Sequence, residues 1–279
     1  MSSSNLSFKI SLLDIDALKP HEEVIDALVE SLADAMATQG VVRDPLIVDQ
    51  DELVILDGMH RHSALKRLKC RFAPCCLVNY TSPLIRVGSW FRLFNVNNPL
   101  RTAEKLLEDH NLEYAKKNVD MRNPSYDPQT IIITGNGIGC SLAKLLDPIE
   151  FSRQAVILEK ALVRQGCHVD YLPENVSVQN LQSGRVNLVI SLPTFTKDQI
   201  RAYGTQGLLL PHKVTRHVMP SRPLRIDAPL AILTDQLSTH TEANRKFGET
   251  LSARRVDRRP PGSVVDGRRY EEELLVFAG

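Results

Sequence analysis

Apolar residues recur every three or four positions in the stretch that follows the sequence LKPHEE, namely at Val24, Ile25, Leu28, Val29, Leu32 and Met36. This spacing predicts an amphipathic helix over about 23–39, and Gly40 is suited to end it. Short apolar runs and one mixed segment then predict strands at 44–50 and 53–56, a helix at 60–68 and a strand at 73–80. The pattern therefore indicates an α-β-β-α-β module that ends near residues 90–97.

A more polar stretch at about 100–130 follows, and we expect a domain boundary or a linker there. Beyond it, the pattern predicts helices at 150–166, 176–184 and 196–204, alternating with strands at 168–172 and 187–191. Such alternation is typical of an α/β domain. We therefore predict an α/β (α+β) fold with domains at 1–98 and 99–235. A basic extension, 236–279, is either a disordered arm or a segment packed on the body.

The run TIIITGNGIGCSL allows two interpretations, a phosphate-binding loop and a β-hairpin. A dinucleotide fingerprint requires GxGxxG at the start of a helix, with an acidic residue about 20 positions later. The spacing here is GxGxG, and β-branched residues flank Asn136-Gly137. A hairpin that turns at Asn136-Gly137 is the favoured interpretation.

The composition is that of an ordinary globular protein, with 43% hydrophobic and 24% charged residues. The formal net charge of +1 does not call for a nucleic-acid partner, and 5% aromatic residues offer little material for base stacking. The five cysteines form no CxxC pair, so neither a metal site nor a disulfide framework is supported. Because the N-terminus lacks signal-peptide features and no apolar run could span a bilayer, we expect a cytoplasmic protein without a membrane partner.

Reactive side chains gather first at Pro20-His21-Glu22-Glu23 and at Leu56–His62. The acids of the first stretch either cap the following helix or take part in chemistry. In the second, Gly58 turns the chain from a strand into a helix whose first residues include His60 and Arg61. Free N–H groups and a guanidinium there suit a phosphate. Asp57 either caps that helix or holds Mg²⁺.

The third reactive stretch is Pro211–His217, in which Lys213, Thr215, Arg216 and His217 offer hydrogen-bond donors within a few positions. Such a group suits a carboxylate or a phosphate. A solvated basic loop is the competing interpretation.

Taken in order, LKPHEEV, ILDGMHRHSALKRLKCRFAP, Ser89-Trp90 and LLLPHKVTRHVMP resemble the free L-serine kinases that carry a ParB-like, sulfiredoxin-like nucleotide-binding domain. The resemblance covers about residues 10–230 and is loose over about 100–175. It implies a ParB-like nucleotide-binding domain followed by a second small α/β domain. It also implies phosphoryl transfer from ADP or ATP, with Mg²⁺, to the hydroxyl of free L-serine. The product, O-phospho-L-serine, is a precursor in cysteine biosynthesis in some organisms.

The resemblance also implies roles for individual residues. Glu22 would be the general base that accepts the serine hydroxyl proton. The nucleotide phosphates would be bound by the turn Asp57, Gly58, Met59, His60 and Arg61, with Asp57 as the metal ligand. L-Serine would be bound by Leu56, Trp90, Lys213, Thr215, Arg216 and His217.

Two departures from the family pattern stand out. Met59 occupies a position where the family often has a histidine, so one phosphate donor is missing. The basic extension beyond about residue 235 lies outside the resemblance.

Three other functions compete with the kinase. A ParB-like DNA-binding transcriptional regulator would share the N-terminal module, but we find no reader helix after residue 90. A sulfiredoxin-like reductase needs a nucleophilic cysteine in the turn, where this chain has Met59, and Cys75 and Cys76 are expected in the core. A nucleotide-binding sensor without catalysis remains open.

Overall fold

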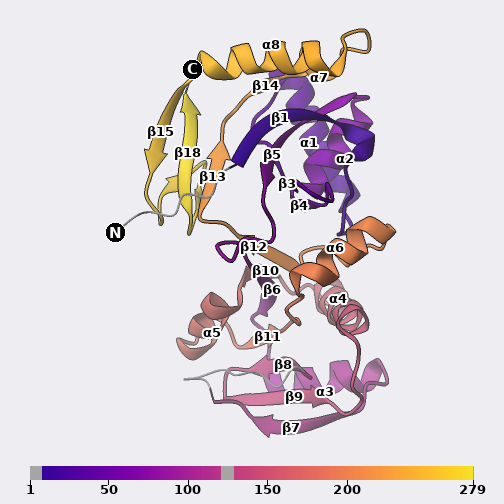
Figure 1. The fold of residues 1–279 in the computed structure, drawn as a ribbon. Coiled ribbons are helices and arrows are strands. Elements are labelled where there is room, and N and C mark those ends of the chain that lie inside the picture. Colours follow the sequence, from indigo (N-terminus) through magenta and orange to yellow (C-terminus); the bar gives the residue numbers. More distant parts are fainter. Residues whose placement is uncertain (1–7, 121–128, 279) are drawn as a thin grey trace. The chain divides into compact units, whose positions relative to one another are not determined.

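The computed structural model describes residues 8–120 and 129–278, and these form two compact units that are considered separately (Figure 1). Among the described residues, the first unit consists of 8–86, 196–212 and 217–278. The second takes its residues from 87–195 and 213–216. The chain therefore leaves the first unit and returns to it twice.

The first unit is built on a four-stranded mixed sheet with the order β1-β5-β3-β4. Its strands are β1 (Phe8–Asp14), β3 (Leu46–Asp49), β4 (Ile55–Asp57) and β5 (Phe72–Val78). The strand β5 pairs antiparallel with β1 and parallel with β3. Two helices, α1 (Asp26–Gln39) and α2 (Met59–Arg67), pack on each other, and Gly40 ends α1 in the left-handed conformation.

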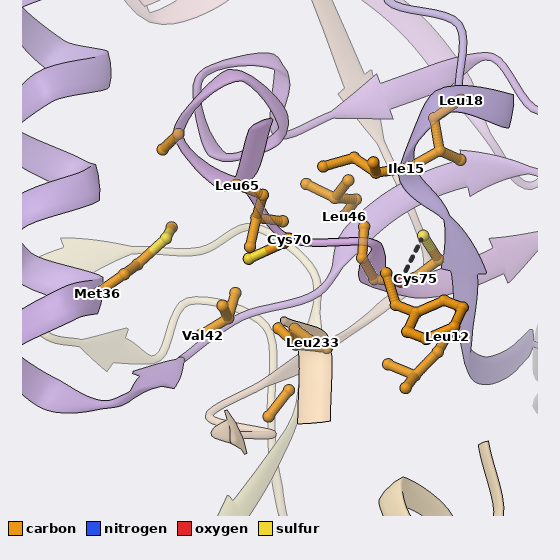
Figure 2. Close-up of a cluster of buried hydrophobic side chains, with 14 of the residues drawn as sticks. Leu12, Ile15, Leu18, Met36, Val42, Leu46, Leu65, Cys70, Cys75 and Leu233 are labelled. Carbon is orange, nitrogen blue, oxygen red and sulfur yellow. Dashed lines mark hydrogen bonds between the residues drawn. The ribbon is translucent and has the colours of Figure 1, made fainter. Parts of the chain in front are cut away.

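The core of this unit joins residues far apart in the sequence (Figure 2). Met36 of α1 and Leu65 of α2 lie in one buried cluster with Leu12 of β1. Cys75 of β5 and Leu233 of α7 (Leu230–Leu233) lie in the same cluster. Burial of such side chains is the main stabilising contribution to a unit of this kind.

The C-terminal segment, residues 217–278, completes the first unit. It contains α8 (His240–Ser252) and a small sheet in which β18 (Glu273–Ala278) pairs parallel with β13 (Ser221–Leu224) and antiparallel with β15 (Arg255–Arg259). Two shorter pairs are β14 (Ala228–Pro229) with β2 (Val41–Val42), and β16 (Val264–Val265) with β17 (Arg268–Arg269). The helix α6 (Lys197–Gln206) also belongs to this unit, and its capping box of Thr196 and Gln199 fixes its start.

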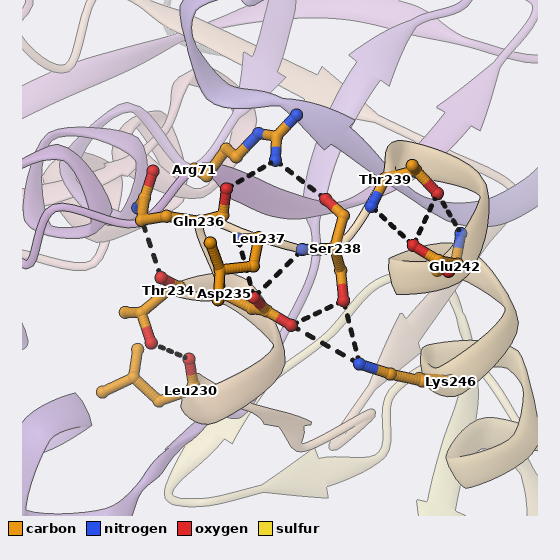
Figure 3. Close-up of polar contacts among 10 residues, drawn as sticks. All are labelled: Arg71, Leu230, Thr234, Asp235, Gln236, Leu237, Ser238, Thr239, Glu242 and Lys246. Carbon is orange, nitrogen blue, oxygen red and sulfur yellow. Dashed lines mark hydrogen bonds and ion pairs between the residues drawn. The ribbon is translucent and has the colours of Figure 1, made fainter.

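Polar contacts fasten this segment to the sheet (Figure 3). Arg71 donates hydrogen bonds to the carbonyl oxygens of Gln236 and Ser238. Thr239 and Glu242 form a capping box that starts α8. Further along α8, the amide of Asn244 bonds the backbone N–H and C=O of Leu12, so the helix covers the edge strand β1.

The predicted extension at 236–279 is therefore a packed part of the first unit, and the compact units do not follow the expected boundaries at 98/99 and 235/236. The physical reason is an apolar face on α8. Ala243 and Phe247, four positions apart, are both buried in the core cluster. Basic residues dominate the composition of this stretch, so its apolar face was not recognised from the sequence.

The second unit contains a sheet of the order β10-β6-β11-β8-β9-β7, in which these neighbouring strands pair antiparallel, and β12 (Thr215–Val218) also pairs with β6. The remaining bounds of its strands are β6 (Arg86–Phe94), β7 (Tyr114–Asn118), β8 (Thr130–Thr134), β9 (Ile138–Leu142), β10 (Asp170–Pro173) and β11 (Leu188–Ile190). Its helices are α3 (Pro99–Asp109), α4 (Pro148–Arg164) and α5 (Glu174–Gln182).

Two predictions for this part of the chain have different outcomes. The hairpin is confirmed, because β8 and β9 pair antiparallel around Asn136-Gly137 and Gly137 has a φ of +77°. The linker at about 100–130 is wrong for its first half, where the structure has α3 and β7. Ala103, Leu106 and Leu107 form the buried face of α3 among charged neighbours. The stretch 121–128 lies outside the described residues.

The mixed α/β fold class is confirmed. Across residues 8–120 and 129–278, no helix is long and apolar enough to cross a bilayer.

Candidate functional site

A glycine turn joins β4 to α2 in the first unit. Gly58 has a φ of +104°, in the left-handed region that favours glycine. A Cβ atom on Gly58 would lie 2.7 Å from Cδ2 of Leu46 and 3.0 Å from Nη2 of Arg61. The first bond of α2 runs from the N–H of His62 to the carbonyl oxygen of Gly58. The amides of residues 59–61 precede it and are the donors that α2 offers to an anion.

Arginine side chains surround the Asp57 carboxylate at the end of β4. Its Oδ2 atom lies 3.1 Å from Nη2 of Arg61 and 2.6 Å from Nη1 of Arg222. Burial alone would raise the pKa of Asp57, but the charges of Arg222 and Arg61 outweigh it and hold the pKa well below its usual value. Arg61 is itself fixed by a hydrogen bond of 2.6 Å to the carbonyl oxygen of Pro45.

This arrangement does not suit Asp57 as a magnesium ligand. The oxygen that would approach the metal already pairs with two guanidinium groups, whose charge repels a cation. Within the described ranges, no group of three or more His, Cys, Asp or Glu side chains could hold a metal ion. Asp57 instead acts as an anchor for arginines.

The two residues after Gly58 have different surroundings. The side chain of Met59 belongs to the buried core cluster, so Met59 can offer only its amide to a phosphate. Nε2 of His60 accepts a hydrogen bond of 3.1 Å from the N–H of Ile25. Because Nε2 is an acceptor there, the ring proton of neutral His60 resides on Nδ1.

Glu22 lies on an extended segment before α1 and is 6% exposed. Glu22 and Leu210 form an isolated parallel bridge, in which the N–H of Leu210 donates to His21 and the N–H of Glu23 donates to Leu210. The prediction that the helix begins at residue 23 is wrong, because α1 begins at Asp26. Glu22 therefore does not cap this helix, and the acid of its first turn is Asp26.

Two buried histidines, His21 of this segment and His217 of β12, lie close to each other. Nδ1 of His21 donates to the carbonyl oxygen of Ile55 at 2.6 Å, and Nε2 of His217 pairs with the hydroxyl of Tyr80 at 2.8 Å. The two imidazole rings meet edge to face, with centroids 5.7 Å apart. Burial, aided by the proximity of His21, lowers the pKa of His217 to about 3, so this imidazole is neutral.

His217 and Leu56, both expected to bind the substrate, lie in the interior of the first unit at 7% and 2% exposure. Sequence reasoning missed Tyr80, the partner of His217. A tyrosine at the end of an apolar run was the only available signal.

The second unit carries the other predicted serine-binding residues. Nζ of Lys213 lies 5.2 Å from the centroid of the Trp90 ring, and Cζ of Arg216 lies 5.5 Å from it. Thr215, between them in sequence, is buried. Cation–π contacts thus hold two positive groups at one indole ring, an arrangement suited to a carboxylate.

A buried arginine that sequence reasoning missed fixes this group. Nη1 of Arg92 donates to the carbonyl oxygens of Trp90 (2.8 Å) and Lys213 (3.0 Å). Its Nε atom pairs with Glu159 at 2.9 Å, and Tyr171 donates its hydroxyl proton to the same carboxylate. Lys213 has a φ of +57°, a backbone conformation that a lysine rarely adopts. The hydrogen bond from Arg92 to its carbonyl oxygen helps to hold it. An arginine within the otherwise apolar run WFRLF was the available signal.

The predicted site residues therefore form two groups, each assembled within one unit. Glu22, residues 56–61 and His217 belong to the first unit, and Trp90, Lys213, Thr215 and Arg216 belong to the second.

The structure disfavours the reductase alternative. Cys75 and Cys76 are buried in β5, and burial raises the pKa of both thiols, to about 12 for Cys76. Thiols of this kind are poor nucleophiles.

Comparison with known proteins adds relatives in sequence and in fold. The chain is 24% identical over 228 residues to an ATP-dependent L-serine kinase of Staphylothermus marinus, covering 78% of this chain and 89% of that protein. It is also 24% identical over 230 residues to an ADP-dependent L-serine kinase of Thermococcus kodakarensis, covering 78% and 90%. No protein-family profile matches the chain.

Solved structures show the same fold. SbnI with a C-terminal truncation, from Staphylococcus aureus, matches with a TM-score of 0.70 and 19% identity, over 88% of this chain and 96% of that one. A free serine kinase in complex with AMP matches with a TM-score of 0.67 and 21% identity, over 80% and 93%. The chain has the fold of these proteins. The resemblance to the free L-serine kinases, inferred from the motifs, is confirmed by these relatives.

Proposed function

We propose that this chain is a kinase that transfers a phosphoryl group from ADP or ATP to the hydroxyl of free L-serine, giving O-phospho-L-serine. One observation carries the proposal. The hydrogen bond from Ile25 to His60 ties the segment that bears the buried Glu22 to the glycine turn at the start of α2. A candidate base and a candidate phosphate site are thereby joined in the first unit, as a phosphoryl transfer to an alcohol requires.

Each group then has a role in the reaction. The amides of residues 59–61, Nδ1 of His60 and the guanidinium of Arg61 bind the nucleotide phosphates. Glu22 accepts the proton of the serine hydroxyl while the hydroxyl oxygen bonds to the terminal phosphorus of the donor. The bond between this phosphorus and the bridging oxygen breaks, and AMP leaves from ADP, or ADP from ATP. Positioning and charge neutralisation supply most of the catalysis in such reactions.

The second unit supplies the amino-acid site in this proposal. Lys213 and Arg216, held at the Trp90 ring, bind the serine carboxylate. The buried Arg92 acts through the backbone of Trp90 and Lys213 and is a positioning residue.

Three expectations go beyond the relatives' names and stay predictions. They are the use of Mg²⁺, a supply of O-phospho-L-serine to cysteine biosynthesis, and a cytoplasmic location. The choice between ADP and ATP also stays open, because named relatives use either.

The test is direct. Purified full-length protein is incubated with L-serine and Mg²⁺, with ADP in one reaction and ATP in another, and O-phosphoserine is measured by mass spectrometry. A parallel pair of reactions contains EDTA in place of Mg²⁺. Product in either reaction, absent with Glu22→Gln, supports the kinase and identifies the donor. If no product forms although nucleotide binds, the kinase proposal fails, and duplex DNA binding then tests the ParB-like alternative.

A further inference from the structure

A small cavity lies against the glycine turn, and part of its wall comes from the C-terminal segment. Its lining includes Asp57 and Arg61 next to the turn, together with Arg222, Arg268 and Tyr270. The cavity measures about 30 Å³, so it has room for a water molecule and not for a phosphate group. Two of these residues, Arg61 and Arg222, contact Asp57, which directly precedes Gly58 of the turn.

Arg222 is the link between the turn and the C-terminal segment. It is 5% exposed, and its Nη1 and Nε atoms each make a contact of 2.6 Å, to Oδ2 of Asp57 and Oε1 of Glu272. The parallel pairing of β13 with β18 places Arg222 opposite Leu274, which brings Glu272, two positions earlier, within reach. Glu272 is itself 8% exposed.

The charges in this chain of contacts balance. Glu272 and Asp57 carry two negative charges, while Arg222 and Arg61 carry two positive charges. This series of contacts ends at the hydrogen bond from Arg61 to the carbonyl oxygen of Pro45. Each of these two carboxylates therefore pairs with at least one guanidinium, and Arg222 joins them.

We propose that Arg222, held by Glu272, is a positioning residue for nucleotide binding: it neutralises Asp57 and fixes Arg61, so that the C-terminal segment sets the affinity of the turn for nucleotide phosphates. The inference rests on the proposed nucleotide site. Without Arg222, the Asp57 carboxylate loses its shorter ion pair and faces incoming phosphates with less compensating charge, while Arg61 remains engaged by it at 3.1 Å. The carboxylate and the phosphates are both negatively charged, so they repel each other.

The main test replaces the buried ion pair by apolar side chains of similar size, as Arg222→Met with Glu272→Leu in the full-length protein. Such replacements are often neutral or stabilising, so the double variant should fold with a Tm near that of the wild type. Calorimetric titration with ADP and with ATP should then show at least tenfold weaker binding, while the KM for L-serine stays within twofold. A purely structural pair would leave nucleotide affinity unchanged in this folded variant, and that result overturns the proposal.

Glu272→Gln provides a second variant in case the double variant does not fold. It keeps the shape of the side chain and should weaken nucleotide binding threefold or more. Asp266→Asn is the matched control, since Asp266 pairs with Arg225 on the surface of the same segment, 2.5 Å away, and should leave nucleotide affinity unchanged. Equal losses in nucleotide affinity and L-serine KM would indicate general loosening and contradict the proposal. If the wild type itself binds no nucleotide, it is the proposed function that fails.

Discussion

The backbone N–H of Ile25 donates a hydrogen bond of 3.1 Å to Nε2 of His60. Ile25 is the N-cap residue of α1 and makes no side-chain capping bond, while His60 stands in the first turn of α2. One imidazole thus joins the two helix starts that carry the PHEE and DGMHR motifs. In the neutral ring the other nitrogen, Nδ1, therefore carries the proton.

Replacement of Glu22 by glutamine tests its role as base. Glutamine keeps the size of this buried side chain and cannot accept the hydroxyl proton. We expect kcat to fall by about 10²- to 10⁴-fold, with the nucleotide dissociation constant unchanged. Glu23→Gln is the matched control, because the adjacent side chain is exposed and should be dispensable. Near-normal turnover by Glu22→Gln would remove the base assignment.

A second prediction concerns the glycine turn. Gly58→Ala combines a φ of +104° with a contact of 2.7 Å to Leu46, so we expect the free energy of unfolding to fall by about 1–3 kcal/mol. Nucleotide affinity should fall with it. In the control Gly40→Ala, φ is +69° but no atom lies within 4 Å of the added Cβ. Urea unfolding measures both variants, and equal losses would show that the close contact at the turn is unimportant.

The cationic group of the second unit leads to a third prediction. If Arg216 binds the serine carboxylate, Arg216→Ala removes a charge-assisted hydrogen bond, and the KM for L-serine should rise about 10- to 100-fold. The KM for the nucleotide should stay the same. Arg153→Ala, at an exposed position on α4, is the control. An unchanged KM for L-serine would show that Arg216 does not bind the amino acid.

A fourth prediction is a loss of stability in mild acid. Burial holds the pKa of His217 at about 3, below the value of 6.5 expected in the unfolded chain. Between these two values the unfolded state binds the proton, so the free energy of unfolding should decrease as the pH falls below about 6.5, by up to about 1.4 kcal/mol per pH unit. The lowered pKa values of His21 and His62 act in the same direction.

Urea unfolding at pH 7.5 and pH 5 measures this effect. His217→Gln should reduce the difference between the two pH values, whereas His168→Gln, an exposed histidine in the second unit, should not. A wild-type stability that is the same at both pH values would contradict the buried, neutral state of His217.

The hydroxyl of Tyr80 supplies a fifth prediction. Tyr80→Phe leaves Nε2 of the buried His217 without its partner, so the free energy of unfolding should fall by about 1–3 kcal/mol. Thermal or urea unfolding checks this value. A neutral effect would mean that His217 finds another partner in the variant.

Local patterns in the sequence were sufficient for much of this protein. Helical periodicity predicted α1, and Gly40 marked its end, because one turn of helix repeats within a short window. The β-branched residues around Asn136-Gly137 predicted the β8–β9 hairpin, and the order of the three motifs indicated the kinase resemblance. The helix and hairpin signals depend on neighbours within a few positions, and each kinase motif is itself a short local pattern.

Other features depended on contacts between distant positions, and only the tertiary structure decided them. The helix α1 starts at Asp26 and not at the predicted residue 23, because Glu22 forms a bridge with Leu210, 188 positions later in the chain. The basic C-terminal segment packs into the first unit because Phe247 reaches the core and Arg222 meets both Asp57 and Glu272. Buried charges such as Arg222 and Arg92 look like surface residues in a sequence, since what makes their burial possible is a partner that the fold brings to them.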